Sequence, residues 1–155
     1  MINSSLTPIE IIALAALISG ILDIASALTL SKLKGITPVR LLQTITSGLM
    51  GPESYQGGAT TAALGIAIHF FIAFAAATVY YAASLRFNAL IQHAVLCGLL
   101  YGIAIHLFMT FIVLPLSALK RPFSAKAFAT QWIVHMFFVG LPIALVIAHF
   151  RTPIL

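Results

Sequence analysis

The stretch Ser19–Ala27, SGILDIASA, decides how the rest of the chain must fold, because it places a carboxylate inside a long apolar run. The chain has three acidic residues, Glu10, Asp23 and Glu53, and of these only Asp23 lies within an apolar segment. A charged side chain in the hydrocarbon of a bilayer costs about 3 kcal/mol or more, so it faces other helices and finds polar partners there. Asp23 therefore predicts a bundle of membrane helices whose interior supplies that partner.

The composition supports a membrane protein of one domain, residues 1–155. Hydrophobic residues make up 61% of the chain and charged residues 7%, and the mean hydropathy is +1.11. Eight basic and three acidic side chains are too few to cover a water-facing surface. The net charge of +5 does not indicate nucleic acid, because the basic residues lie in short clusters between apolar runs, as they do beside membrane spans.

Four segments are long and apolar enough to cross a bilayer. Residues 8–30 would form about 34 Å of helix, and the hydrocarbon is about 30 Å thick. Thr7-Pro8-Ile9-Glu10 has the capping-box spacing at its start, and Thr37-Pro38 and Ser124 are further N-cap signals. The other spans are predicted over residues 59–85, 94–119 and 127–150.

Residues 38–50 form a fifth, shorter apolar segment that also contains polar residues. It is too short to span, so we expect a helix that lies at the interface or re-enters partway. It is either an amphipathic connector that anchors the bundle or a segment that lines a pore or acts as a lid. The predicted fold class is thus all-α, an integral membrane four-helix bundle with an additional short interfacial or re-entrant helix between helices 1 and 2.

In an antiparallel bundle, Asp23, His69 and His135 fall within about one helical turn of each other in depth. Thr110 and Gln131 lie near that level, and His106 is expected about a turn closer to the centre. Small or polar residues recur every four positions on each span, which lets helices approach closely and bond across the contact. The stripes are Ala15, Ser19, Asp23, Ala27 and Ser31; Thr61, Gly65, His69, Ala73 and Ala77; Gly98, Gly102, His106 and Thr110; and Gln131 with His135.

Several roles are open for this polar layer. Asp23 could pair with a histidine only to fix helix register. A carboxylate beside two imidazoles could instead relay protons or hold a cation, because these groups change charge near neutral pH. Asp23, His69 and His135 also have acceptable chemistry for zinc or iron. Haem would need two facing histidines, for which His69 with His135 or His106 are the candidates. No cofactor is expected by default.

The same residues resemble a family of small, uncharacterised bacterial inner-membrane proteins with four helices. The resemblance rests on Asp23, on LLQTITSGL at residues 41–49, on Gly57-Gly58 before His69, on VLPLS at residues 113–117, and on His135 before VGLP at residues 139–142. It implies a fold and an inner-membrane location without a reaction. An aromatic residue stands at the position of His106 in that family, which implies that His106 is less central than His69 and His135.

Three functions follow as hypotheses. The first is proton or ion conduction or sensing through the Asp/His layer. The second is a structural or accessory membrane subunit with a purely structural Asp–His pair. The third is a binder of a hydrophobic cofactor, haem or quinone, or of a metal. The chain has no nucleophile triad or phosphate-cradling loop, so we do not expect an enzyme. The lipid bilayer is the expected environment, and a bundle this small favours a homodimer or a larger membrane complex.

The basic residues predict the orientation of the chain. Six of them lie in the first and third connections and two on the other side, so the two longer connections are expected in the cytoplasm and both termini outside. The six are Lys32, Lys34, Arg40, Lys120, Arg121 and Lys126, and the two are Arg86 and Arg151.

A reporter enzyme fused after Leu155 tests this orientation. We expect a reporter that matures only outside the cytoplasm to be active there, and the same reporter fused after Lys34 to be inactive. A Leu155 fusion that is active only with a cytoplasmic reporter would reverse the predicted topology.

Overall fold

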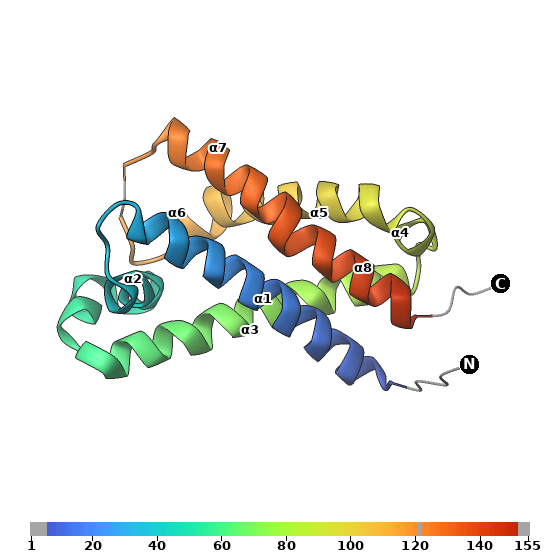
Figure 1. Ribbon diagram of the computed structural model, residues 1–155, viewed down its shortest axis with the longest axis horizontal. Coiled ribbons are helices and arrows are strands. Elements are labelled where there is room, and N and C mark those ends of the chain that lie inside the picture. Colours follow the sequence, from blue (N-terminus) through green and yellow to red (C-terminus); the bar gives the residue numbers. More distant parts are fainter. Residues whose placement is uncertain (1–5, 121, 152–155) are drawn as a thin grey trace.

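The computed structural model describes residues 6–120 and 122–151, and it confirms the predicted class: a bundle of four long helices with an additional shorter helix (Figure 1). Two of the long helices are continuous, and the third and fourth each contain a π-helical turn. The elements are α1 (Pro8–Lys32), α2 (Pro38–Met50), the 3-10 helix η1 (Gly51–Gln56), α3 (Gly58–Ser84), α4 (Ala89–Gln92), α5 (Ala94–Phe108), the π-helix η2 (Met109–Val113), α6 (Leu114–Leu116), α7 (Ala125–Val134), the π-helix η3 (His135–Gly140) and α8 (Leu141–Phe150).

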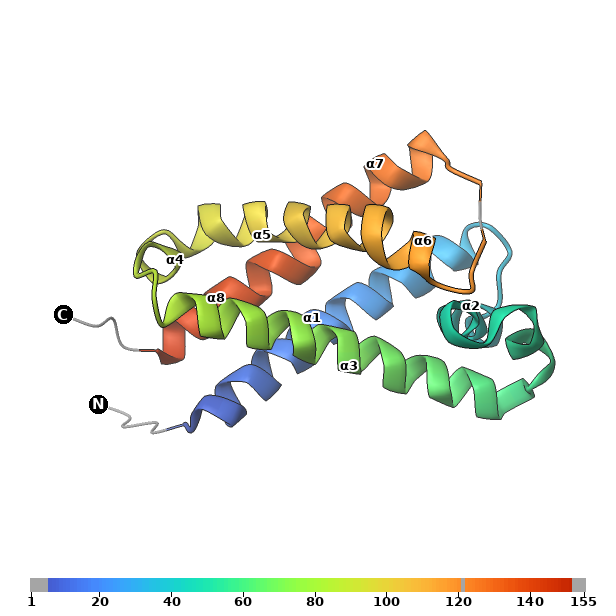
Figure 2. The same cartoon turned by 180° about the vertical axis from the view of Figure 1, so that it is seen from behind.

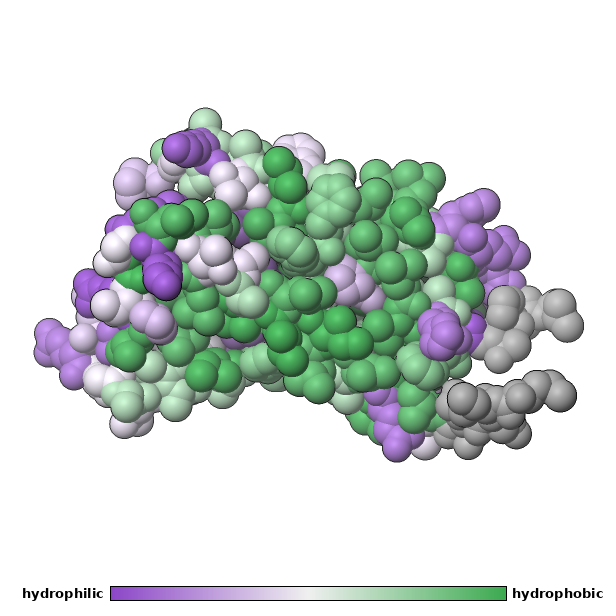
Figure 3. Space-filling view, in the orientation of Figure 1, coloured by the Kyte–Doolittle hydropathy of each residue, from purple (hydrophilic) through white to green (hydrophobic). Residues whose placement is uncertain are grey.

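The four long helices have the length and surface of membrane spans. They contain 25, 27, 23 and 26 residues, with mean hydropathies between 2.1 and 2.3 over their most apolar stretches. About 20 apolar residues suffice to cross the hydrocarbon. Figure 3 shows hydrophobic side chains covering the middle of the molecule and hydrophilic ones gathered towards its two ends. The fold is therefore that of an integral membrane protein.

The predicted N-caps are confirmed. The Thr7 hydroxyl accepts from the Glu10 backbone N–H at 3.4 Å, and the Glu10 carboxylate accepts from the Thr7 N–H at 2.7 Å, which completes the capping box. The Thr37 and Ser124 hydroxyls cap α2 and α7 by accepting from the backbone N–H groups of Arg40 and Ala127. The third long helix ends at Leu116 and not at Leu119 as predicted, because Ser117 is extended.

The third and fourth long helices each contain a proline that follows a π-helical turn. Pro115 lies just after η2 and Pro142 just after η3. A proline has no N–H to donate and its ring clashes with the preceding turn, so a regular α-helix cannot continue through it without adjustment. The wider π turn is one such adjustment, and π turns are frequent beside functional sites.

The two ends of the bundle differ in their contents. The start of α1, α4 and the end of α8 lie at one end, called here the terminal end (Figure 1). The α2 end holds α2, η1, the start of α3 and the start of α7. α1 packs between α3 and the fourth helix, and α5 packs on the fourth helix. α3 and α5 come close near α4 and diverge towards the α2 end (Figure 2).

The terminal half of the bundle is filled by a close-packed apolar core. Ile143, Ala144 and Ile147 of α8 are fully buried there against α1 and α3. The Tyr80 hydroxyl donates to the Leu90 carbonyl at 2.9 Å and the Tyr101 hydroxyl to the Ala76 carbonyl at 2.7 Å, which ties α3 to α4 and α5. This half is therefore closed by side-chain packing.

α2 is docked on α3 through its polar side chains. The Gln43 amide donates to the Gly58 carbonyl at 3.1 Å, and the Thr46 hydroxyl donates to the Thr61 carbonyl at 2.6 Å. Gly65 leaves room for the Leu42 backbone against α3. Because its polar face is satisfied by the protein, α2 is part of the bundle and not only an anchor on its surface.

The contact between α5 and the fourth helix depends on three glycines, Gly98, Gly102 and Gly140, which meet backbone to backbone. A Cβ on Gly102 would lie 2.6 Å from the Met136 Cα and would overlap the His135 carbonyl. Small residues at such contacts are the usual means by which membrane helices approach closely.

Replacing Gly102 with alanine tests this contact. The added methyl group must push α5 away from η3, so Gly102→Ala is expected to lower the free energy of unfolding by about 1–3 kcal/mol. Unfolding in a titration with denaturing detergent measures it. Gly48→Ala is the control, because a Cβ there meets Ser117 at an ordinary 3.9 Å. Equal stability of the two variants would contradict the close contact.

Candidate functional site

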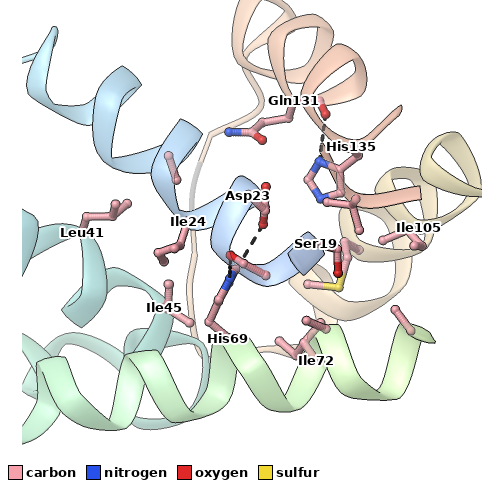
Figure 4. A pocket seen from close by; sticks show the side chains of 16 residues that line it. Ser19, Asp23, Ile24, Leu41, Ile45, His69, Ile72, Ile105, Gln131 and His135 are labelled. Carbon is pink, nitrogen blue, oxygen red and sulfur yellow. Dashed lines mark hydrogen bonds and ion pairs between the residues drawn. The ribbon is translucent and has the colours of Figure 1, made fainter. Parts of the chain in front are cut away.

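A cavity of about 220 Å³ lies inside the α2 half of the bundle (Figure 4). A water molecule takes about 30 Å³ of liquid, so the cavity has room for several waters or a small organic group. Its polar lining comes from α1, α3 and the fourth helix: Ser19, Asp23, His69, Gln131 and His135. The remaining lining is Gly20, Ile24, Ala27, Leu41, Ile45, Ile72, Ala73, Ala76, Ile105, Met109 and Val139.

Asp23 and His69 face each other in this cavity. The Asp23 Oδ2 atom lies 4.0 Å from the His69 Nδ1 atom, and the two side chains are 22% and 12% exposed. This separation is longer than a hydrogen bond, for which about 2.7–3.2 Å is normal. The carboxylate and the ring are therefore neighbours with a gap between them, and both can be reached from the cavity.

A backbone contact decides which nitrogen of His69 carries the proton. The His69 Nε2 atom lies 2.9 Å from the Gly20 carbonyl of α1. A carbonyl oxygen can only accept, so Nε2 carries the N–H. In the neutral ring, Nδ1 is then a bare acceptor, and it is the atom that faces Asp23. A proton on Nδ1 would instead make the ring a cation paired with the carboxylate.

Gly20 makes this backbone contact sterically feasible. Phe70 follows His69 in the chain, and a Cβ at Gly20 would lie 2.7 Å from the edge of its ring. A side chain at this position would therefore displace the Phe70 ring. The glycine thus allows the His69 ring to reach a carbonyl on the neighbouring helix.

His135 has the opposite tautomer. Its Nδ1 atom lies 2.8 Å from the Gln131 carbonyl one turn earlier in the same helix, so Nδ1 carries the N–H. The neutral ring then presents Nε2 as an acceptor, and Figure 4 shows the ring on the same cavity as Asp23. Three acceptors therefore serve one cavity: the Asp23 carboxylate, His69 Nδ1 and His135 Nε2.

His106 lies beside His135 and outside the cavity lining. Its side chain is buried at 5% exposure, its ring centre is 5.2 Å from that of His135 and 4.6 Å from that of Phe128, and its Nε2 atom has no hydrogen-bond partner among the described residues. That His106 lies about a turn closer to the centre stays a prediction, because the 5.2 Å between the two rings is itself about the rise of one helical turn.

Thr110 is also not among the residues that line the cavity. The stripe that contains Gly98, Gly102 and His106 packs against the fourth helix. Ile105 and Met109 are the residues of the third helix that line the cavity. The structure thus brings together Asp23, His69, His135 and Gln131, and it leaves His106 in the contact between the third and fourth helices and Thr110 outside the cavity lining.

Within the described residues, no group of three or more His, Cys, Asp or Glu side chains is close enough to hold one metal ion. Asp23, His69 and His135 share a cavity, but they are not gathered as the ligands of one metal. Comparison with protein-family models, curated proteins and solved structures finds no match to this chain.

Nitrogen-15 NMR of the histidine rings tests this geometry. At a pH where both rings are neutral, we expect His69 as the Nε2–H tautomer and His135 as the Nδ1–H tautomer, because each donates to a backbone carbonyl. The exposed His149 serves as the solvent reference. Finding both rings in the same tautomer would contradict the assignment of three acceptors.

Proposed function

We propose that this membrane protein binds a proton or a small cation between Asp23, His69 and His135, and that it senses or carries protons or ions through the occupancy of this site. The observation that supports the proposal best is the 4.0 Å gap between the Asp23 carboxylate and the bare His69 nitrogen. Two acceptors that face each other repel unless a proton, a bridging donor or a cation lies between them. We therefore expect a proton, a bridging donor or a cation to occupy this gap.

The groups around Asp23 set its charge state. His69 of α3 and His135 of η3 face the cavity, His106 of α5 lies behind His135, and α2 contributes only the apolar Leu41 and Ile45. None of the described residues that line the cavity is Lys or Arg. An ionised Asp23 thus has no fixed positive partner, and its charge must be balanced by a proton on an imidazole or by a bound cation.

The structure favours access from one side. The α2 half contains the cavity, whereas the terminal half is filled by buried side chains such as Ala15, Ala77 and Ile143. A continuous pore is not compatible with that packing. We propose that the site exchanges its ion with the α2 side, and that carriage across the membrane would need a second conformation.

The basic residues support a cytoplasmic assignment for the α2 end. Lys32, Lys34, Arg40, Lys120 and Lys126 flank the helices there, and Arg121 lies outside the described residues. This bias fits a bacterial inner membrane with both termini outside. A site open to the α2 side would then respond to conditions in the cytoplasm.

A purely structural Asp–His pair is the alternative. A pair that only holds helices together gains most from a direct hydrogen bond of about 2.7–2.9 Å. The 4.0 Å separation does not provide one. His69 already contributes to register through the Gly20 carbonyl, which does not need Asp23.

Proton uptake distinguishes the two functions. With the protein in lipid nanodiscs, a pH-indicator dye should report the protons that the protein takes up as the medium is acidified. Asp23→Asn should reduce this uptake, because no anion is left to stabilise a proton on His69; the exposed His93 and His149 contribute equally to the uptake of both proteins. His69→Gln should also reduce it, and Glu53→Gln, at an exposed position, should not.

The same variants define the contrary result. If Asp23→Asn and His69→Gln fold normally by circular dichroism and take up protons like the wild type, the pair is structural. Proton flux into liposomes adds an independent measure, because an unchanged flux in Asp23→Asn would exclude carriage through this site.

A further inference from the structure

We infer that the cavity takes a small primary ammonium ion that carries a short apolar group. This inference rests on the proposed function, because it names the class of cation that the Asp23–His69–His135 site would hold. It follows from three features of the described residues: the number of acceptors, the spacing of two of them, and the apolar character of the walls.

The acceptors on the cavity wall suit an ammonium group. A primary ammonium has three N–H donors and no acceptor; Asp23 and His69 Nδ1 face each other as acceptors, and the acceptor Nε2 of His135 belongs to the same cavity lining. Two acceptors that share one donor nitrogen at about 2.8 Å lie roughly 4–5 Å apart. The 4.0 Å between Asp23 Oδ2 and His69 Nδ1 fits such a shared donor.

Hard metal ions fit the same site poorly. Calcium takes about six to eight oxygen ligands and magnesium about six. The cavity lining offers one carboxylate, the Gln131 amide and the Ser19 hydroxyl, and that hydroxyl donates to the Ala16 carbonyl of its own helix at 3.3 Å. Two of the three strong acceptors are imidazole nitrogens, which suit N–H donors better than such ions.

The apolar walls of the cavity favour a ligand that carries an apolar group. Beyond the polar side chains, the lining consists of Gly20 and ten apolar residues. In Figure 4, Ile24, Leu41, Ile45 and Ile72 lie around the Asp23 and His69 side chains. A bare ammonium ion would leave this surface in contact with water. Burial of apolar surface contributes roughly 25 cal/mol per Å², so an alkyl group on the ammonium would bind more tightly.

A proton and the ammonium ion would compete for one carboxylate. Asp23 holds the ammonium only when it is ionised, and protons on His69 or His135 would remove their acceptors. Acidification should therefore release the amine. Binding of the amine should in turn expel protons, which gives the site the exchange chemistry of a sensor or carrier of organic cations.

Primary ammonium groups also occur on phosphatidylethanolamine headgroups. A headgroup brings a phosphate with it, and no Lys or Arg among the described residues lines the cavity to receive that anion. The cavity of about 220 Å³ lies between membrane spans and not at their ends. We therefore assign the site to a free amine.

Calorimetric titration of n-hexylammonium into the protein in phosphatidylcholine nanodiscs tests the inference. Uncharged 1-hexanol is the matched probe without the ammonium. We expect hexylammonium to bind at least about tenfold more tightly than hexanol. Asp23→Asn should weaken it by at least about tenfold, His135→Phe should also weaken it, and His149→Gln at the terminal end should not. Binding should fall on acidification.

Each contrary result has a distinct meaning. Equal binding of hexanol would show a merely apolar cavity and would overturn the inference. Proton uptake that depends on Asp23 without any binding of hexylammonium would also overturn it while leaving the proposed function intact. Loss of hexylammonium binding in nanodiscs made with phosphatidylethanolamine would assign the site to the lipid headgroup. If Asp23→Asn fails to fold, the His135→Phe comparison decides.

Discussion

The hydrogen bond from His69 Nε2 to the Gly20 carbonyl is the interaction on which the site depends. It spans 2.9 Å between α3 and α1, and a glycine at this position leaves room for the Phe70 ring beside it. By occupying Nε2, it leaves Nδ1 to face Asp23 without a proton of its own in the neutral ring. One contact between a side chain and a backbone thus sets the spacing of two helices, the tautomer of a histidine and the charge requirement of a carboxylate.

The remainder of the bundle supports an asymmetric interior. Small residues bring the helices together, with Gly98, Gly102 and Gly140 joining α5 to the fourth helix. In the terminal half this close approach leaves no space, whereas in the α2 half α3 and α5 diverge and α2 closes the end. A cavity with polar groups and a sealed core therefore coexist in one short bundle. That arrangement suits an ion that enters and leaves from the α2 side more than an ion that passes through the whole bundle.

Much of this could be predicted from the sequence. Hydropathy and capping signals identified the four spans and α2, and counting residues from the helix ends placed Asp23, His69 and His135 at one depth. His106 and Thr110 were misplaced for a physical reason: periodicity gives the stripes on a helix but not the neighbour that each stripe faces. The extended Ser117, which ends the third helix early, has no strong sequence signal. The tautomers depend on carbonyls of Gly20 and Gln131, which no side-chain pattern reveals.

The central claim is that Asp23 exchanges a proton or cation with the α2 side of the membrane only. Infrared difference spectroscopy on uniformly oriented proteoliposomes tests it, with pH changed on one side at a time by an impermeant buffer and the Asp23 carboxyl band identified by its loss in Asp23→Asn. The account predicts that this band responds to pH on the α2 side and not to pH on the terminal side. A response from the terminal side, or none from the α2 side, would contradict it.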